Sequence, residues 1–157
     1  MATLGTFSSG QVLTASELNQ LNNVTALELT SAINIPTGAP TAITFGAGTE
    51  IVDVSGWHST STNTDRITPN IAGVYLVTAY MRWNETALND YGISITKNGT
   101  SINDVILEGD YYPGAAGATI VSLNGTTDYV SLTGYTTSGI TRQLFRAGLT
   151  CTLLRKS

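Results

Sequence analysis

The stretch GVYLVTAYMRW at residues 73–83 decides the fold class of this chain. Read with a period of two, its odd-numbered positions place Tyr, Val, Ala, Met and Trp on one face, which suits a protein core. The opposite face holds Val74, Leu76, Thr78, Tyr80 and Arg82. A strand with water on one side alternates apolar with polar residues, and this one barely does. We therefore expect both of its faces to be covered.

The predicted strands at residues 117–123 and 148–155 have the same two-sided character. A single sandwich has one core, which covers only one face of each sheet. Covering the second face therefore requires another copy of the chain. The alternative is that uncharged, β-branched residues are simply tolerated at the surface.

Strand signals continue outward from this segment in both directions. Charged residues make up 11% of the 157 positions, against about a quarter in an ordinary domain. Asn98-Gly99 and Asn124-Gly125 are tight-turn signals between consecutive apolar runs. Short strands at this spacing, without intervening helices, predict an all-β antiparallel sandwich. The expected strands are 42–46, 49–54, 65–68, 73–83, 91–97, 102–108, 117–123, 128–136 and 148–155.

Charge and composition exclude several functions. The net charge of −4 and pI of about 4.7 provide no clustered cations for nucleic acid. No stretch approaches the roughly 20 apolar residues of a membrane span, and no secretory signal is visible. With one cysteine, Cys151, and one histidine, His58, we expect no metal, no cofactor and no enzyme activity. A hydrolase that uses His58 with Ser59 or Ser61 is the weakest alternative.

The N-terminal third carries a helix signal. Thr14 and Glu17 match a capping box. A stripe of apolar residues follows at helical spacing and must dock on a partner, because an isolated helix of this length is marginal in water. The predicted docking residues are Leu13, Leu18, Leu21, Val24 and Leu27. We therefore expect an arm with a docking helix at residues 1–33, a Pro- and Gly-containing linker at 34–41, and the strand domain at 42–157.

Three segments of the strand domain resemble the jelly roll of tumour necrosis factor (TNF) and C1q, in the form found in bacteriophage structural proteins. They are IVDVSGWH at 51–58 with the residues up to Ala79, ITKNG at 95–99, and LNG at 123–125 with DYVSL at 128–132. Thr126 and Thr127 interrupt the Gly-Asp pair that the family often has. The last strand also lacks the family's usual Phe-x-Gly signature, with Phe145 and Gly148 only loosely placed, which leaves its register open. The resemblance implies a homotrimer in which Val74, Leu76, Thr78 and Tyr80 approach the three-fold axis.

The segment FSSGQVLTASELN at 7–19 is similar to a leader found in phage tail, fibre and head-appendage proteins. Together the two resemblances imply a virion protein assembled in the bacterial cytoplasm. It would be a trimeric head decoration or fibre, or a tail appendage, attached to other virion proteins through its arm. Host, docking partner and head or tail location stay open.

A second hypothesis is a module at a tail tip that binds a carbohydrate or a host receptor. Tyr91, Tyr111 and Tyr112 lie near predicted loops, where an aromatic ring can stack on a sugar; the alternative is that they pack between strands or subunits. Nearby, Asp104, Glu108 and Asp110 could contribute to a Ca²⁺ site, although acids at a strand edge also discourage edge pairing.

Overall fold

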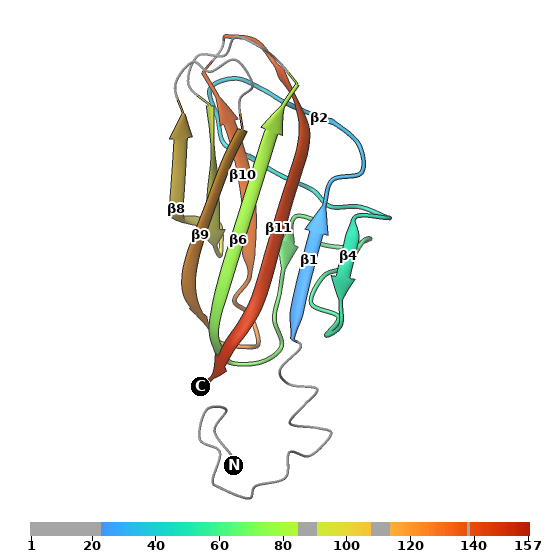
Figure 1. The fold of residues 1–157 in the computed structure, drawn as a ribbon, viewed down its shortest axis with the longest axis vertical. Helices are drawn as coiled ribbons and strands as arrows, with labels where there is room; N and C mark the ends of the chain where they lie inside the picture. Colours follow the sequence, from blue (N-terminus) through green and yellow to red (C-terminus); the bar gives the residue numbers. More distant parts are fainter. Residues whose placement is uncertain (1–22, 85–90, 108–113, 138) are drawn as a thin grey trace, which may run out of the picture.

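The computed structural model describes residues 23–84, 91–107, 114–137 and 139–157. Within these residues every regular element is a β-strand, and every pair of neighbouring strands is antiparallel. Two sheets lie face to face (Figure 1). The described part of the chain is an all-β antiparallel jelly-roll sandwich; the strand spacing predicts the antiparallel sandwich, and the TNF/C1q resemblance implies the jelly roll.

The first sheet has six strands. Its spatial order is β4 (Glu50–Asp53), β1 (Val24–Glu28), β11 (Arg142–Lys156), β6 (Gly73–Trp83) and β9 (Gly114–Leu123), and β2 (Ile33–Ile35) also pairs with β11. The second sheet has five strands, in the order β3 (Thr41–Ala42), β10 (Val130–Thr136), β7 (Tyr91–Lys97) and β8 (Thr100–Leu107), with β5 (Arg66–Ile67) also paired to β10. Neighbouring strands satisfy each other's backbone hydrogen bonds, and each sheet leaves two faces to be covered.

The core fills the space between the sheets. In β6 the side chains from Tyr75 to Trp83 on the odd positions are at most 5% exposed, as predicted. Trp83 meets Tyr91 of the facing sheet edge-on, with ring centroids 6.4 Å apart. Each fully buried large side chain stabilises the fold by about 1.5–3 kcal/mol. This shared apolar layer therefore fixes which face of each sheet points inward.

The register of the last strand is settled by its pairing with β6. Cys151 lies opposite Val77 and Leu149 opposite Ala79, so both point into the core. Burial raises the pKa of the Cys151 thiol to about 12, because a thiolate would lose its hydration there. The alternate residues Thr150 and Thr152 point out of the sandwich.

The segment Val24–Glu28 corrects the predicted helix. It forms strand β1, which pairs with β11 on one side and β4 on the other. Its burial alternates, so that Leu27 is 1% exposed in the core while Val24 is only partly buried. The helix predicted from the spacing of the apolar residues is wrong here, because β11 provides a backbone hydrogen-bond partner strand along the whole segment. This pairing outweighs the local preference of the segment for a helix. Residues 24–35 therefore belong to the sandwich, and residues 1–22 lie outside the described part.

The two Asn-Gly turns play different roles. Asn98 and Gly99 both have positive φ and close the β7–β8 hairpin, as the dipeptide predicts. Asn124-Gly125 also lies between consecutive strands, but it connects β9 of the first sheet to β10 of the second, so this turn crosses between the sheets and does not close a hairpin. The Asn124 side chain accepts the backbone N–H groups of residues 126–128 at 2.9–3.0 Å. Thr126 and Thr127 thus lie in a loop whose backbone N–H groups are hydrogen-bonded to the Asn124 side chain.

Candidate functional site

The outer face of the six-stranded sheet carries uncharged residues across four strands. Two neighbouring rows run across β9, β6, β11 and β1 in the order of pairing. One row is Ile120, Leu76, Thr152 and Val24, and the next is Ala118, Thr78, Thr150 and Ala26. We call these eight residues, together with Val74 and Tyr80 of β6, the aliphatic face.

Charged residues lie on either side of these two rows, further along the strands. On one side, beyond Tyr80, are Arg82 of β6 and the pair in which Arg146 donates a hydrogen bond to Glu28 across 3.1 Å. On the other side Arg155 lies opposite Val74. An uncharged centre with a polar margin is the composition that protein–protein interfaces have in their buried core and rim. The aliphatic face therefore has the character of an interface.

Several residues of this face are exposed in the single chain. Ile120 is 66% exposed and Tyr80 is 39% exposed, whereas Val74, Leu76 and Thr78 are partly buried by their neighbours. Single exposed apolar side chains are ordinary, but two continuous rows form a patch of the kind that marks interaction sites. Burying it against another chain would release the water that now covers it.

Tyr80 lies flat on this face because its neighbour on β11 is a glycine. A β-carbon added at Gly148 would lie 2.3 Å from the Tyr80 ring. The pKa of Tyr80 is raised, first by partial burial and then by its hydrogen bond to Glu28. The Tyr80 ring therefore lies close to the sheet as an uncharged part of the surface, beside the Glu28–Arg146 pair.

The predicted interface residues of β6 lie together on the aliphatic face, and of the predicted docking and sugar-binding residues the structure describes Val24, Leu27 and Tyr91. Leu27 is in the core, so its side chain cannot dock on a partner, and Val24 belongs to the aliphatic face. Tyr91 is 0% exposed and packs on Trp83, which rules it out as a sugar platform. The remaining predicted residues lie outside the described part of the chain; they are Leu13, Leu18, Leu21, Tyr111 and Tyr112.

His58 is held by the loop that follows β4. Its Nδ1 atom lies 2.8 Å from the Glu50 carboxylate and its Nε2 atom 3.4 Å from the Thr64 carbonyl oxygen. Its backbone N–H, like that of Trp57, donates to Asp53. Both ring nitrogens thus contact groups of β4 or of the loop that follows it, an arrangement that supports a structural role for this histidine.

Among the described residues, no group of three or more His, Cys, Asp or Glu side chains comes together that could hold a metal ion. Of the acids considered for Ca²⁺, Asp104 is placed on β8, and Glu108 and Asp110 are outside the described ranges. None of the elements in this part of the chain is a helix long and apolar enough to cross a membrane.

No protein-family model matches the chain, and no curated protein matches its sequence. Solved structures do match. The globular domain of zebrafish complement 1qA superposes with a TM-score of 0.64 at 12% identity, covering 86% of this chain and 98% of that one. Vertex protein P5 of the phage PRD1 gives 0.66 at 13% identity, covering 83% of this chain and 72% of its own. Murine APRIL at pH 5.0 gives 0.61 at 11% identity, covering 83% and 99%.

These likenesses establish the class of protein: a jelly roll of the TNF/C1q-like fold. At 11–13% identity they concern the fold alone. Sequence reasoning located the β6 part of the aliphatic face but did not name Ala118, Ile120, Thr150 or Thr152. The two-sided pattern of strands 117–123 and 148–155 was the signal for them, and the register was needed to place them beside Leu76 and Thr78.

Proposed function

We propose that this chain is a non-enzymatic structural protein of a bacteriophage virion, a homotrimer that acts as a head decoration or fibre, or as a tail appendage. The observation that carries the proposal is the aliphatic face, which is uncharged across four strands. A face of this kind stabilises an assembly when identical copies bury it around a symmetry axis. Three copies agree with the trimer that the TNF/C1q resemblance implies.

The virion role is supported by two independent likenesses. The fold is shared with a vertex protein of PRD1, and the segment at residues 7–19 resembles the leader of phage appendage proteins. Either alone would be weak support, since the same fold also occurs in complement 1qA and APRIL. We assign attachment to residues 1–22, with Leu13, Leu18 and Leu21 as the docking side chains. Three such arms on one trimer would add avidity to weak individual contacts.

The assembly is tested by light scattering of the full chain at micromolar concentration. The expected mass is three times the subunit mass of 16.5 kDa. A single subunit at this concentration would contradict the trimer, and with it the assignment of the aliphatic face.

Attachment is tested with the double variant Leu18→Asp and Leu21→Asp. The trimer should persist in solution, while cryo-electron microscopy of assembled particles should show that the protein has been lost from them. Dissociation of this variant into monomers would instead make the N-terminal segment a trimerisation element. In the same experiment, cryo-electron microscopy of wild-type particles shows whether the protein lies on the head or on the tail.

A further inference from the structure

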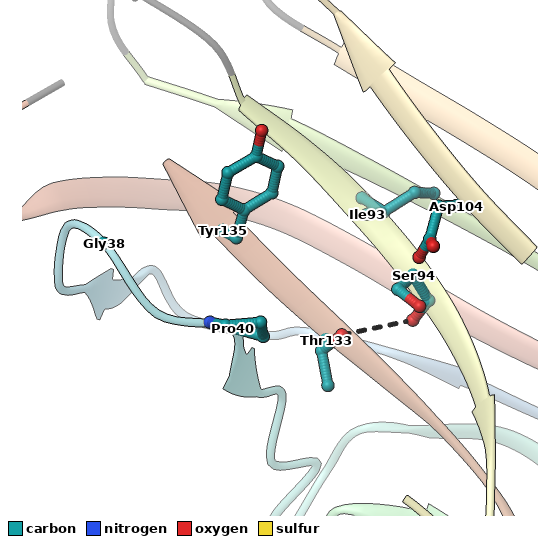
Figure 2. A pocket seen from close by; sticks show the side chains of 7 residues that line it. All are labelled: Gly38, Pro40, Ile93, Ser94, Asp104, Thr133 and Tyr135. Carbon is teal, nitrogen blue, oxygen red and sulfur yellow. Dashed lines mark hydrogen bonds between the residues drawn. The ribbon is translucent and has the colours of Figure 1, made fainter. Parts of the chain in front are cut away.

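The outer face of the five-stranded sheet contains a hollow of about 340 Å³. The segment around Gly38 and Pro40 forms one wall, β10 and β7 form the floor, and Asp104 of β8 forms the far side (Figure 2). Its size is at the lower end of the range of small-molecule sites, which is about 300–1,000 Å³.

The wall at residues 38–40 is fixed to the sheet. Gly38 N–H and the Thr37 hydroxyl both donate to the Thr136 carbonyl oxygen, at 2.9 and 3.2 Å. Directly afterwards Thr41 pairs with Gly134 in β10. Because these bonds hold the wall at both ends, the hollow is formed without a ligand, which lowers the entropic cost of binding one.

The lining combines an aromatic ring with oriented polar groups. Tyr135 is partly exposed, and the residue opposite it in β7 is Gly92, which has no side chain to cover the ring. Ser94 donates a hydrogen bond to Ser101 at 2.7 Å, and Ser101 donates to Asp104 at 2.6 Å. The hydrogen bonds from Ser101 and Ser94 lower the pKa of Asp104. Asp104 is thus a charged acceptor at neutral pH, and its two oxygens have lone pairs beyond those that the two serines use.

We infer that this hollow binds a neutral saccharide, with one sugar ring against Tyr135 and Pro40 and its hydroxyls on Asp104, Ser94 and Thr133. A sugar presents an apolar C–H surface and a rim of hydroxyls, which matches an aromatic ring beside hydrogen-bonding groups. The one charged group of the lining is a carboxylate, which disfavours phosphates and acidic sugars. A purely apolar ligand would leave the remaining acceptor positions of the Asp104 carboxylate unsatisfied.

The hollow and the aliphatic face lie on opposite outer surfaces of the sandwich, with the core between them. Assembly through the aliphatic face therefore leaves the hollow open, and a trimer would present three copies of it. Binding to a surface that carries many copies of the sugar would then gain from multivalency. The site differs in every residue from the tyrosines that the sequence suggested, and it does not depend on the virion assignment.

The test is saturation-transfer NMR of the full chain with methyl glycosides of glucose, galactose, mannose, N-acetylglucosamine and rhamnose. At least one glycoside should bind, and Asp104→Ala and Tyr135→Ala should each weaken its affinity at least about tenfold, because each removes a main contact. The matched control Thr126→Ala changes an exposed residue of the β9–β10 loop and should bind like the wild type.

Three results would overturn the saccharide assignment: no glycoside binds the wild type, binding survives both substitutions, or tetramethylammonium binds and displaces the bound glycoside. The last result would make the hollow a site for organic cations. Asp104 is exposed, so its variant should fold even if Tyr135→Ala does not, and circular dichroism checks this. Light scattering of the same samples separates loss of the site from loss of the trimer.

Discussion

The two outer faces of the sandwich differ although the sheets share one core. On the six-stranded sheet the outward side chains of β6, β9, β11 and β1 form uncharged rows. On the five-stranded sheet the outward positions of β7 and β8 hold Ser94, Ser101 and Asp104, joined by hydrogen bonds. Burying the uncharged first face against another chain costs little hydration free energy. Burying the second face would remove water from its polar and charged groups without providing new hydrogen-bond partners. This difference supports the proposal that the first face serves assembly and that the second stays in solvent.

The largest expected effect comes from charging the aliphatic face. In the double variant Leu76→Asp and Ile120→Asp the adjacent carboxylates would be buried on assembly, and unpaired buried charges cost several kcal/mol each. We expect monomers at micromolar concentration by light scattering, with the β-sheet circular dichroism retained. The matched control Thr100→Asp, exposed on the five-stranded sheet, should remain trimeric. A trimeric double variant would show that the two faces do not differ in this way.

A smaller effect should follow from truncating the core side of β1. Leu27→Ala leaves a cavity in the sandwich and should lower the free energy of unfolding by about 2–5 kcal/mol. Val24→Ala, on the outward side of the same strand, should change it much less. Urea unfolding at one fixed protein concentration compares the two variants, since assembly makes apparent stability depend on concentration. Equal stabilities would restore the helical interpretation of this segment.

The smallest expected effect concerns Gly148. In Gly148→Ala the new methyl group meets the Tyr80 ring at 2.3 Å, so the ring must leave its position on the aliphatic face. Such a displacement costs about 0.5–1.5 kcal/mol and should weaken trimer association measurably while the subunit stays folded. Gly46→Ala is the control, because a β-carbon there meets nothing within 4 Å. Sedimentation at a series of concentrations would measure the trimer association constant of each variant. Identical association constants for the two variants would exclude Tyr80 from the interface.

The residue pattern of a segment was sufficient to predict the strands that are long, apolar and bounded by turn residues. The bounds predicted for β6 and β7 match those observed, and the Asn98-Gly99 turn lies between β7 and β8 as expected. The segment at residues 24–28 was predicted as a helix and not as a strand because Val24 and Leu27 fit a helical period, whereas the core-facing positions of the strand, Thr25 and Leu27, are not both apolar. Only the backbone of β11, more than a hundred residues further along the chain, decides between helix and strand.

One of the two candidate sites could be predicted from the sequence and the other could not. The aliphatic residues of β6 were predictable, because a strand without charged alternation indicates two covered faces. The saccharide-sized hollow was not, since Pro40, Asp104 and Tyr135 come from three distant segments with no shared motif.

The sequence by itself determined the all-β class, the central strands and the uncharged character of one face, because alternation and turn chemistry act between near neighbours. The tertiary structure alone decided that β1 is a strand, which rows align on the aliphatic face, and that a hollow opens on the opposite side. These features depend on pairing between distant segments, and the free energy of such pairing appears only when the partner strand is in place.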